Sequence, residues 1–270
     1  MEPVVPENPT PVVFIHGLWL HSSSWQAWID LFEAHGYAAT APGWPGDADT
    51  VTESRANPDA VADVGVDAVA EHYASYIDTL PARPILIGHS FGGLLVERLL
   101  GEDRAVAGVA IDAAPIKGVL PLPLSALRVA FAALKNPGNI DAAISLTKEQ
   151  FRYGFGNAID EDESAALFDR WTIPSPARPL FQAAGANVNP HAATKVDTGN
   201  AGRGPLLLTM GGKDHTVPEA ISKSTYKQYR KSEASTELVE FADRGHSLTI
   251  DHGWRDVADS VLAWLKGKGL

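Results

Sequence analysis

A serine flanked by glycines is the residue best suited to chemistry in this sequence. Residues 88–92 read GHSFG, the pattern G-x-S-x-G, between an apolar run at 84–87 and a helical pattern at 91–100. Glycines two residues before and after the serine permit a sharp strand-to-helix turn that exposes its hydroxyl. The N-terminus of the following helix favours negative charge beside that hydroxyl. Ser90 is therefore predicted to be a nucleophile.

A serine hydroxyl needs a base to take its proton, and His246 is the preferred candidate. His246 lies in a turn directly after the last predicted strand, at 236–241. His215 is the main rival, because it neighbours the preferred acid. His89, inside the serine motif, is expected to point away from the pocket.

A carboxylate must orient the base, and Asp214 is the preferred acid. It follows a predicted strand at 205–210 and a glycine turn, and it precedes Pro218, which can open the next helix. Asp112 is the alternative, because it also ends a predicted buried strand, at 106–111. The sequence predicts a carboxylate at the carboxyl end of a strand, with Asp214 favoured over Asp112.

Two backbone N–H groups are expected to stabilise the oxyanion of an acyl-transfer intermediate. Phe91 N–H follows the nucleophile directly. The second donor is predicted to be Leu18 N–H, in the turn HGLW at 16–19, where Gly17 lets the backbone approach closely. The side chains expected to line the pocket are Trp19, His21 and Trp44.

Alternating strands and helices must position these residues. The order of the apolar runs predicts an α/β fold with a mostly parallel, doubly wound sheet. Such sheets place their sites at the carboxyl ends of strands, where all the candidates lie. One long helix is predicted over about 59–80. From 115 to 204 the sequence pattern changes to short helical stretches separated by prolines, with no convincing strand. The aromatic residues of this segment are expected mainly to pack in the interior.

Composition narrows the class of protein. The 270 residues carry a net charge of −11, which argues against nonspecific nucleic-acid binding and anionic membranes. There is no cysteine, no metal-binding motif and no phosphate loop, so neither a metal nor a cofactor is expected. The N-terminal segment, 1–9, lacks the features of a signal peptide, so a cytoplasmic location is expected. The expected partner is a small-molecule substrate; the oligomeric state is not predicted.

Four motifs together resemble the α/β-hydrolase superfamily: HGLW at 16–19, GHSFG at 88–92, GKDHTVP at 212–218 and GHS at 245–247. Their order, Ser…Asp…His, is that of the superfamily. The chain looks similar to its small carboxylesterase and cofactor-free haloperoxidase-like branch. The resemblance implies an α/β-hydrolase fold with a core at 1–114 and 205–270 and a helical cap at 115–204. It also implies the roles given above to Ser90, Asp214, His246, Leu18 and Phe91.

Departures from related branches narrow the expected reaction. Haloalkane dehalogenases and epoxide hydrolases carry aspartate where this chain has Ser90. Hydroxynitrile lyases typically have lysine where this chain has Ser247. The expected activity is that of a carboxylesterase on a small to medium, hydrophobic ester. The alternatives are the same triad acting on another bond (a lactonase, amidase, C–C hydrolase or perhydrolase), or a ligand receptor on the same fold.

Overall fold

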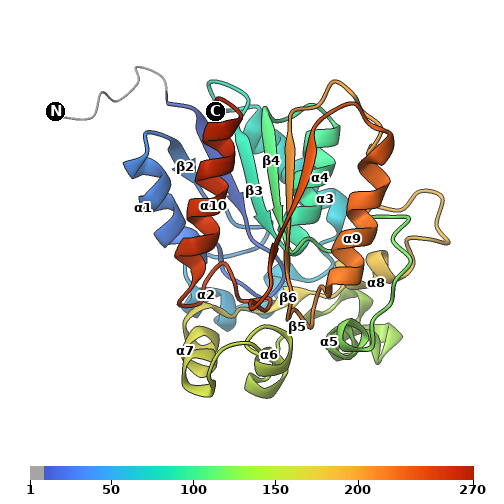
Figure 1. The fold of residues 1–270 in the computed structure, drawn as a ribbon. Coiled ribbons are helices and arrows are strands. Elements are labelled where there is room, and N and C mark those ends of the chain that lie inside the picture. Colours follow the sequence, from blue (N-terminus) through green and yellow to red (C-terminus); the bar gives the residue numbers. More distant parts are fainter. Residues whose placement is uncertain (1–8) are drawn as a thin grey trace.

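The structure, a computed structural model, describes residues 9–270 and is built on one parallel sheet (Figure 1). Six strands lie in the order β2-β1-β3-β4-β7-β8, and every neighbouring pair is parallel. The predicted parallel, doubly wound sheet is therefore confirmed. Residues 1–8, on which the signal-peptide expectation largely rests, lie outside the described residues. The strands are β1 (Pro11–Ile15), β2 (Ala38–Thr40), β3 (Ile85–His89), β4 (Ala107–Ile111), β7 (Leu206–Gly211) and β8 (Thr236–Phe241).

Helices cover both faces of the sheet, which explains why the central strands are apolar at every position. On one face, Val12 and Phe14 pack against α1 (Gln26–Ala34) and α10 (Trp254–Gly267). On the other face, Val13 and Ile15 belong to a second core cluster. Its helices include α3 (Val66–Ile77), α4 (Phe91–Gly101) and α9 (Glu219–Gln228).

The prediction of one long helix over 59–80 is wrong. A short helix, α2 (Val51–Ala56), and a 3-10 turn at Pro58–Val61 come first, and α3 begins at Val66. Asp63 between them has φ 62°, a left-handed conformation that interrupts any helix. The apolar spacing of the two segments therefore does not indicate one continuous helix.

Between β4 and β7 the chain forms a separate layer beyond the carboxyl ends of the strands, where α5, α6 and α7 lie in Figure 1. Two short strands in this layer pair antiparallel, although no strand was expected here. Each has only two residues, too few to produce a visible alternation. The elements are α5 (Leu124–Leu134), β5 (Ala143–Ile144), α6 (Lys148–Gly154), α7 (Glu161–Trp171), β6 (Ser175–Pro176) and α8 (Arg178–Ala184).

After α8 the chain leaves this layer and returns along the core to the start of β7. The Asn200 amide donates to Gly101 O over 3.0 Å, and the Arg98 guanidinium donates to Ala193 O over 3.0 Å. Both contacts are with α4. Because β7 is parallel to β4, the chain must travel from the carboxyl ends of the strands back to their amino ends before β7 begins. The last part of 115–204 therefore packs on the core.

Candidate active site

Ser90 occupies the turn between β3 and α4 with a backbone that only this local sequence permits. Its φ of 56° and ψ of −121° are unusual for a residue with a side chain. A Cβ on Gly88 would lie 2.2 Å from Gly92 O, and one on Gly92 would lie 2.1 Å from Ile15 O. Both glycines are therefore required, and the turn places Ser90 at the carboxyl end of the sheet, buried from bulk solvent but lining a cavity.

His246 and Asp214 form a buried hydrogen-bonded pair. His246 Nδ1 lies 2.6 Å from Asp214 Oδ2, and neither side chain is exposed to solvent. The other carboxylate oxygen accepts the backbone N–H groups of Thr216 and Val217, over 2.6 Å and 2.8 Å. These bonds hold the carboxylate still, and the carboxylate in turn orients the imidazole.

The other ring nitrogen of His246, Nε2, is buried and has no hydrogen-bond partner among the described residues. No hydrogen bond joins it to Ser90 Oγ within residues 9–270. Such bonds are often long without substrate and tighten in the complex. A buried nitrogen without a partner is free to accept a proton.

Burial sets the protonation states of the pair. It lowers the pKa of His246 to about 4 and raises the pKa of Asp214 to about 6. At neutral pH the imidazole is therefore neutral and the carboxylate is ionised. These are the states in which a histidine acts as a base and a carboxylate orients it.

Asp112, the alternative acid, lies beside Asp214 rather than bonded to His246. It is fully buried, and its carboxyl accepts hydrogen bonds from Gly211 N over 3.0 Å and Thr209 Oγ1 over 3.3 Å. Burial, followed by the charge and hydrogen bond of Asp214, raises the pKa of Asp112 well above its ordinary value. Burial and the neighbouring Asp214 therefore favour the protonated form of Asp112, which lies close to both Asp214 and His246.

Asp112, Asp214 and His246 each have a possible metal-ligand atom within 4.8 Å of the others. They are the one such group in residues 9–270. Asp214 Oδ2 and His246 Nδ1 already bond each other, however, so a metal ion would have to replace that hydrogen bond. The arrangement is that of a hydrogen-bonded acid and base.

Two rings hold the imidazole of His246 in place. The His89 ring centroid lies 4.5 Å from it, and the Phe155 ring centroid lies 4.8 Å from it at 74°. His89 does not line the cavity, as expected, but it contacts the candidate base directly. The rival base His215 is engaged elsewhere, because its Nδ1 bonds Tyr153 O over 3.0 Å.

The turn after β1 lies against the serine. A Cβ on Gly17 would be 2.7 Å from Ser90 Cβ and 3.3 Å from Phe91 N, so only glycine fits. Neither Leu18 N–H nor Phe91 N–H donates a hydrogen bond within residues 9–270. The structure therefore leaves both amides available beside Ser90.

The inserted layer fastens this turn, which the sequence did not predict. Trp19 N–H donates to the buried Ser175 Oγ over 2.6 Å, and Trp19 Nε1 donates to Ile144 O over 3.0 Å. Ile173 N–H donates to Trp19 O over 3.0 Å. Ser175 lies 156 residues from Trp19 in the chain, so no local signal identifies it.

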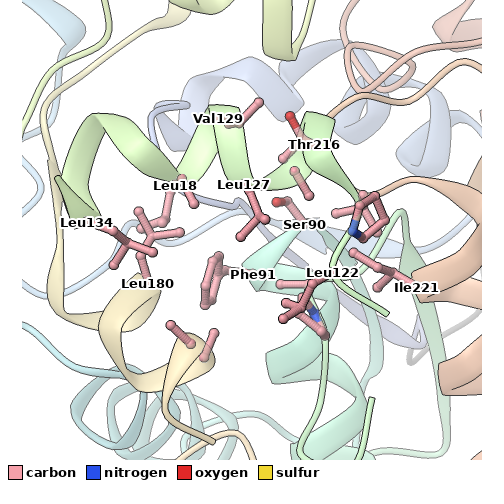
Figure 2. Close-up of a pocket in the computed structure, with 18 of the residues that line it drawn as sticks. Leu18, Ser90, Phe91, Leu122, Leu127, Val129, Leu134, Leu180, Thr216 and Ile221 are labelled. Carbon is pink, nitrogen blue, oxygen red and sulfur yellow. The ribbon is translucent and has the colours of Figure 1, made fainter. Parts of the chain in front are cut away.

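An apolar cavity of about 790 Å³, including its open mouth, leads to Ser90 (Figure 2). Trp19 belongs to its lining. His21 and Trp44, which were also expected there, do not: the His21 ring bonds Ser23 Oγ and Ala48 O, and the Trp44 indole donates to His16 O. Apart from Ser90 and Thr216 the lining is apolar, and it includes Leu18, Phe91, Leu127, Leu134, Leu180 and Ile221.

Comparisons with known proteins agree with this architecture. A family model described as the alpha/beta hydrolase family matches residues 12–260. No curated protein matches the sequence. Among the described residues, no helix has the length and apolar character needed to cross a membrane.

Solved structures share the fold at low sequence identity. A methylesterase from Arabidopsis has a TM-score of 0.66 at 18% identity, over 95% of this chain and 99% of its own. The monoacylglycerol lipase of Paleococcus ferrophilus has a TM-score of 0.66 at 21% identity, over 96% and 95%. An esterase from Thermogutta terrifontis has a TM-score of 0.66 at 17% identity, over 96% and 90%. At these identities the likeness is one of fold.

Proposed function

The chain belongs to the alpha/beta hydrolase family, and from that premise we propose that it is a serine carboxyl-ester hydrolase. The observation that carries the proposal is the buried imidazole of His246. One of its nitrogens is bound to Asp214 over 2.6 Å, and the other has no partner among the described residues. The fold neighbours named above, two esterases and a lipase, are consistent with ester hydrolysis.

The proposed reaction passes through an acyl-enzyme. Ser90 Oγ attacks the ester carbonyl while His246 Nε2 takes the hydroxyl proton, and the proton then passes to the leaving alcohol. The N–H groups of Leu18 and Phe91 stabilise the negative oxygen of the tetrahedral intermediate. Water, activated by the same imidazole, releases the acid and restores the serine. This mechanism requires neither a metal nor a cofactor.

The proposed substrate is a small to medium, hydrophobic ester. Among residues 9–270 no charged side chain lines the cavity, so a charged substrate group would lose its hydration without gaining a partner. The layer formed by α5 to α8 is proposed to be a cap, because Leu127, Leu134 and Leu180 supply part of the lining. The alternatives are attack on a related bond and ligand binding without turnover.

The test is hydrolysis of p-nitrophenyl esters from acetate to long chains, with the wild type and Ser90→Ala measured side by side. We expect turnover of short to medium esters by the wild type and none above background by the variant. Full activity of Ser90→Ala would refute the nucleophile. Tight ligand binding with no turnover by the wild type would favour the receptor alternative.

A further inference from the structure

The inserted layer carries an unusual apolar surface on its outer side. Six large apolar side chains are exposed among residues 9–270, and five of them lie between 120 and 131. The sixth, Val188, follows Asn187, whose side chain bonds Gly118 N and Val119 O, directly before this segment. The five, here called the α5 patch, are Leu120 (73% exposed), Leu122 (73%), Leu124 (85%), Leu127 (42%) and Phe131 (62%).

Helix α5 is apolar on both of its sides. Leu124, Leu127 and Phe131 have the spacing i, i+3, i+7 and form an outward stripe. Val129 and Ala132 are buried against the rest of the protein. Ser125 and Arg128 are the polar residues of this helix. Exposed apolar side chains gathered in one place commonly mark a contact site, so the outward stripe of α5 is a candidate contact surface.

The patch is continuous with the cavity that leads to Ser90. Leu122 and Leu127 are exposed members of the patch and also line the cavity, and Figure 2 shows both beside Ser90. Molecules that contact the patch therefore meet the mouth of the cavity. A second copy of the chain seated here would cover that mouth, so the position favours a partner that itself supplies the substrate.

The distribution of charged residues around the α5 patch also favours contact with an apolar phase. The chain carries a net charge of −11, yet no Asp or Glu occurs between Asp112 and Asp141. The Arg128 guanidinium lies 3.8 Å from the ring centroid of Tyr153, and Lys117 Nζ bonds Asn189 O over 2.6 Å. Burying the patch therefore desolvates no carboxylate of its own segment, and two of its cations already have partners.

We propose that the α5 patch docks on the surface of an aggregated ester, such as a droplet or a micelle, from which single ester molecules enter the cavity. This inference rests on the proposed ester hydrolysis and adds the physical state of the substrate. The net charge of −11, which disfavours contact with anionic membranes, belongs to the whole chain, whereas the patch is a local region without carboxylates.

The test uses tributyrin, which is dissolved below its solubility limit and emulsified above it. We expect the wild-type rate to rise steeply at that limit. Leu120, Leu124 and Phe131 are exposed but do not line the cavity. The variant Leu120→Ser/Leu124→Ser/Phe131→Ser should therefore keep its rate on dissolved ester within about twofold and lose about tenfold or more on the emulsion.

A matched control changes three exposed alanines away from the cavity, Ala27→Ser/Ala68→Ser/Ala82→Ser, and should behave as the wild type on both forms of the ester. If the triple patch variant does not fold, the single variant Leu124→Ser takes its place with a smaller expected loss.

Binding is measured separately from catalysis with Ser90→Ala protein, which should partition onto tributyrin droplets unless it carries the patch substitutions. Partition without hydrolysis by the wild type would support the docking surface and refute the ester hydrolase. A smooth rate curve through the solubility limit, or equal partition of the patch variant, would overturn the proposal. So would a wild-type dimer that the patch substitutions convert to a monomer in sedimentation, because the patch would then be a subunit interface.

Discussion

The roles of the two buried carboxyl groups, Asp214 and Asp112, can be distinguished by replacing each with asparagine, which has nearly the same shape. In Asp214→Asn the amide can still accept the N–H groups of Thr216 and Val217, but it no longer provides a charge for His246. The neutral amide also permits the wrong tautomer of the imidazole, and the same change in a catalytic triad lowers kcat about 10⁴-fold. That fall corresponds to about 5 kcal/mol of transition-state stabilisation. KM should change little, because Asp214 does not line the cavity.

The same substitution should stabilise the protein at high pH. Burial raises the pKa of Asp214 from 3.8 to about 6, so the folded state binds its proton more tightly than the unfolded state. The stability from this group is full below pH 3.8 and is lost as the pH rises through about 6. At 1.36 kcal/mol per pH unit the loss is about 3 kcal/mol. Asp214→Asn should therefore unfold at a higher temperature than the wild type at pH 8 and at a similar temperature below pH 4.

Asp112→Asn is the control, because burial and the neighbouring Asp214 already favour the neutral form of this carboxyl. Its amide can bond Gly211 N, Thr209 Oγ1 and Asp214 as the acid does, so kcat should fall less than about tenfold. Initial rates on a soluble p-nitrophenyl ester and thermal melts from pH 4 to 9 measure both effects. A large loss of kcat in Asp112→Asn, with little loss in Asp214→Asn, would refute the assignment of the orienting acid.

Three further outcomes are expected. Ser175→Ala removes the partner of the Trp19 N–H and should lower kcat about tenfold or more, because the turn that carries one oxyanion donor loosens; rescue by Ser175→Thr would separate this from a folding defect. The value of kcat/KM should fall as the pH drops through about 6, where Asp214 takes a proton, and a pH–rate profile checks this. Burial raises the pKa of Glu97 from 4.5 to about 8, so its contribution to stability is full below pH 4.5 and lost by about pH 8. Glu97→Gln should therefore melt at a higher temperature than the wild type at pH 9, with no difference at pH 4.

The sequence by itself determined the features that depend on local backbone geometry and on alternation. The turn at Ser90 needs glycine at 88 and 92, because any Cβ there would collide with a backbone oxygen. The fully apolar strands predicted a sheet covered on both faces, and the order of strands and helices predicted parallel pairing. Both requirements involve residues close together in the chain, which makes them visible without a structure.

Only the tertiary structure decided which distant residues meet. It placed Asp214 against His246 and Asp112 behind them, a choice between two strand ends that local sequence leaves open. It turned His21 and Trp44 away from the cavity, because their ring nitrogens find partners elsewhere.

Contacts across the inserted layer were equally beyond local reasoning. The structure brought Ser175 to Trp19 across 156 residues. It also left Phe131 exposed, although most aromatic residues of 115–204 were expected to pack. Side-chain contacts depend on how the helices of the inserted layer sit on the sheet, and no periodicity in the chain encodes that placement.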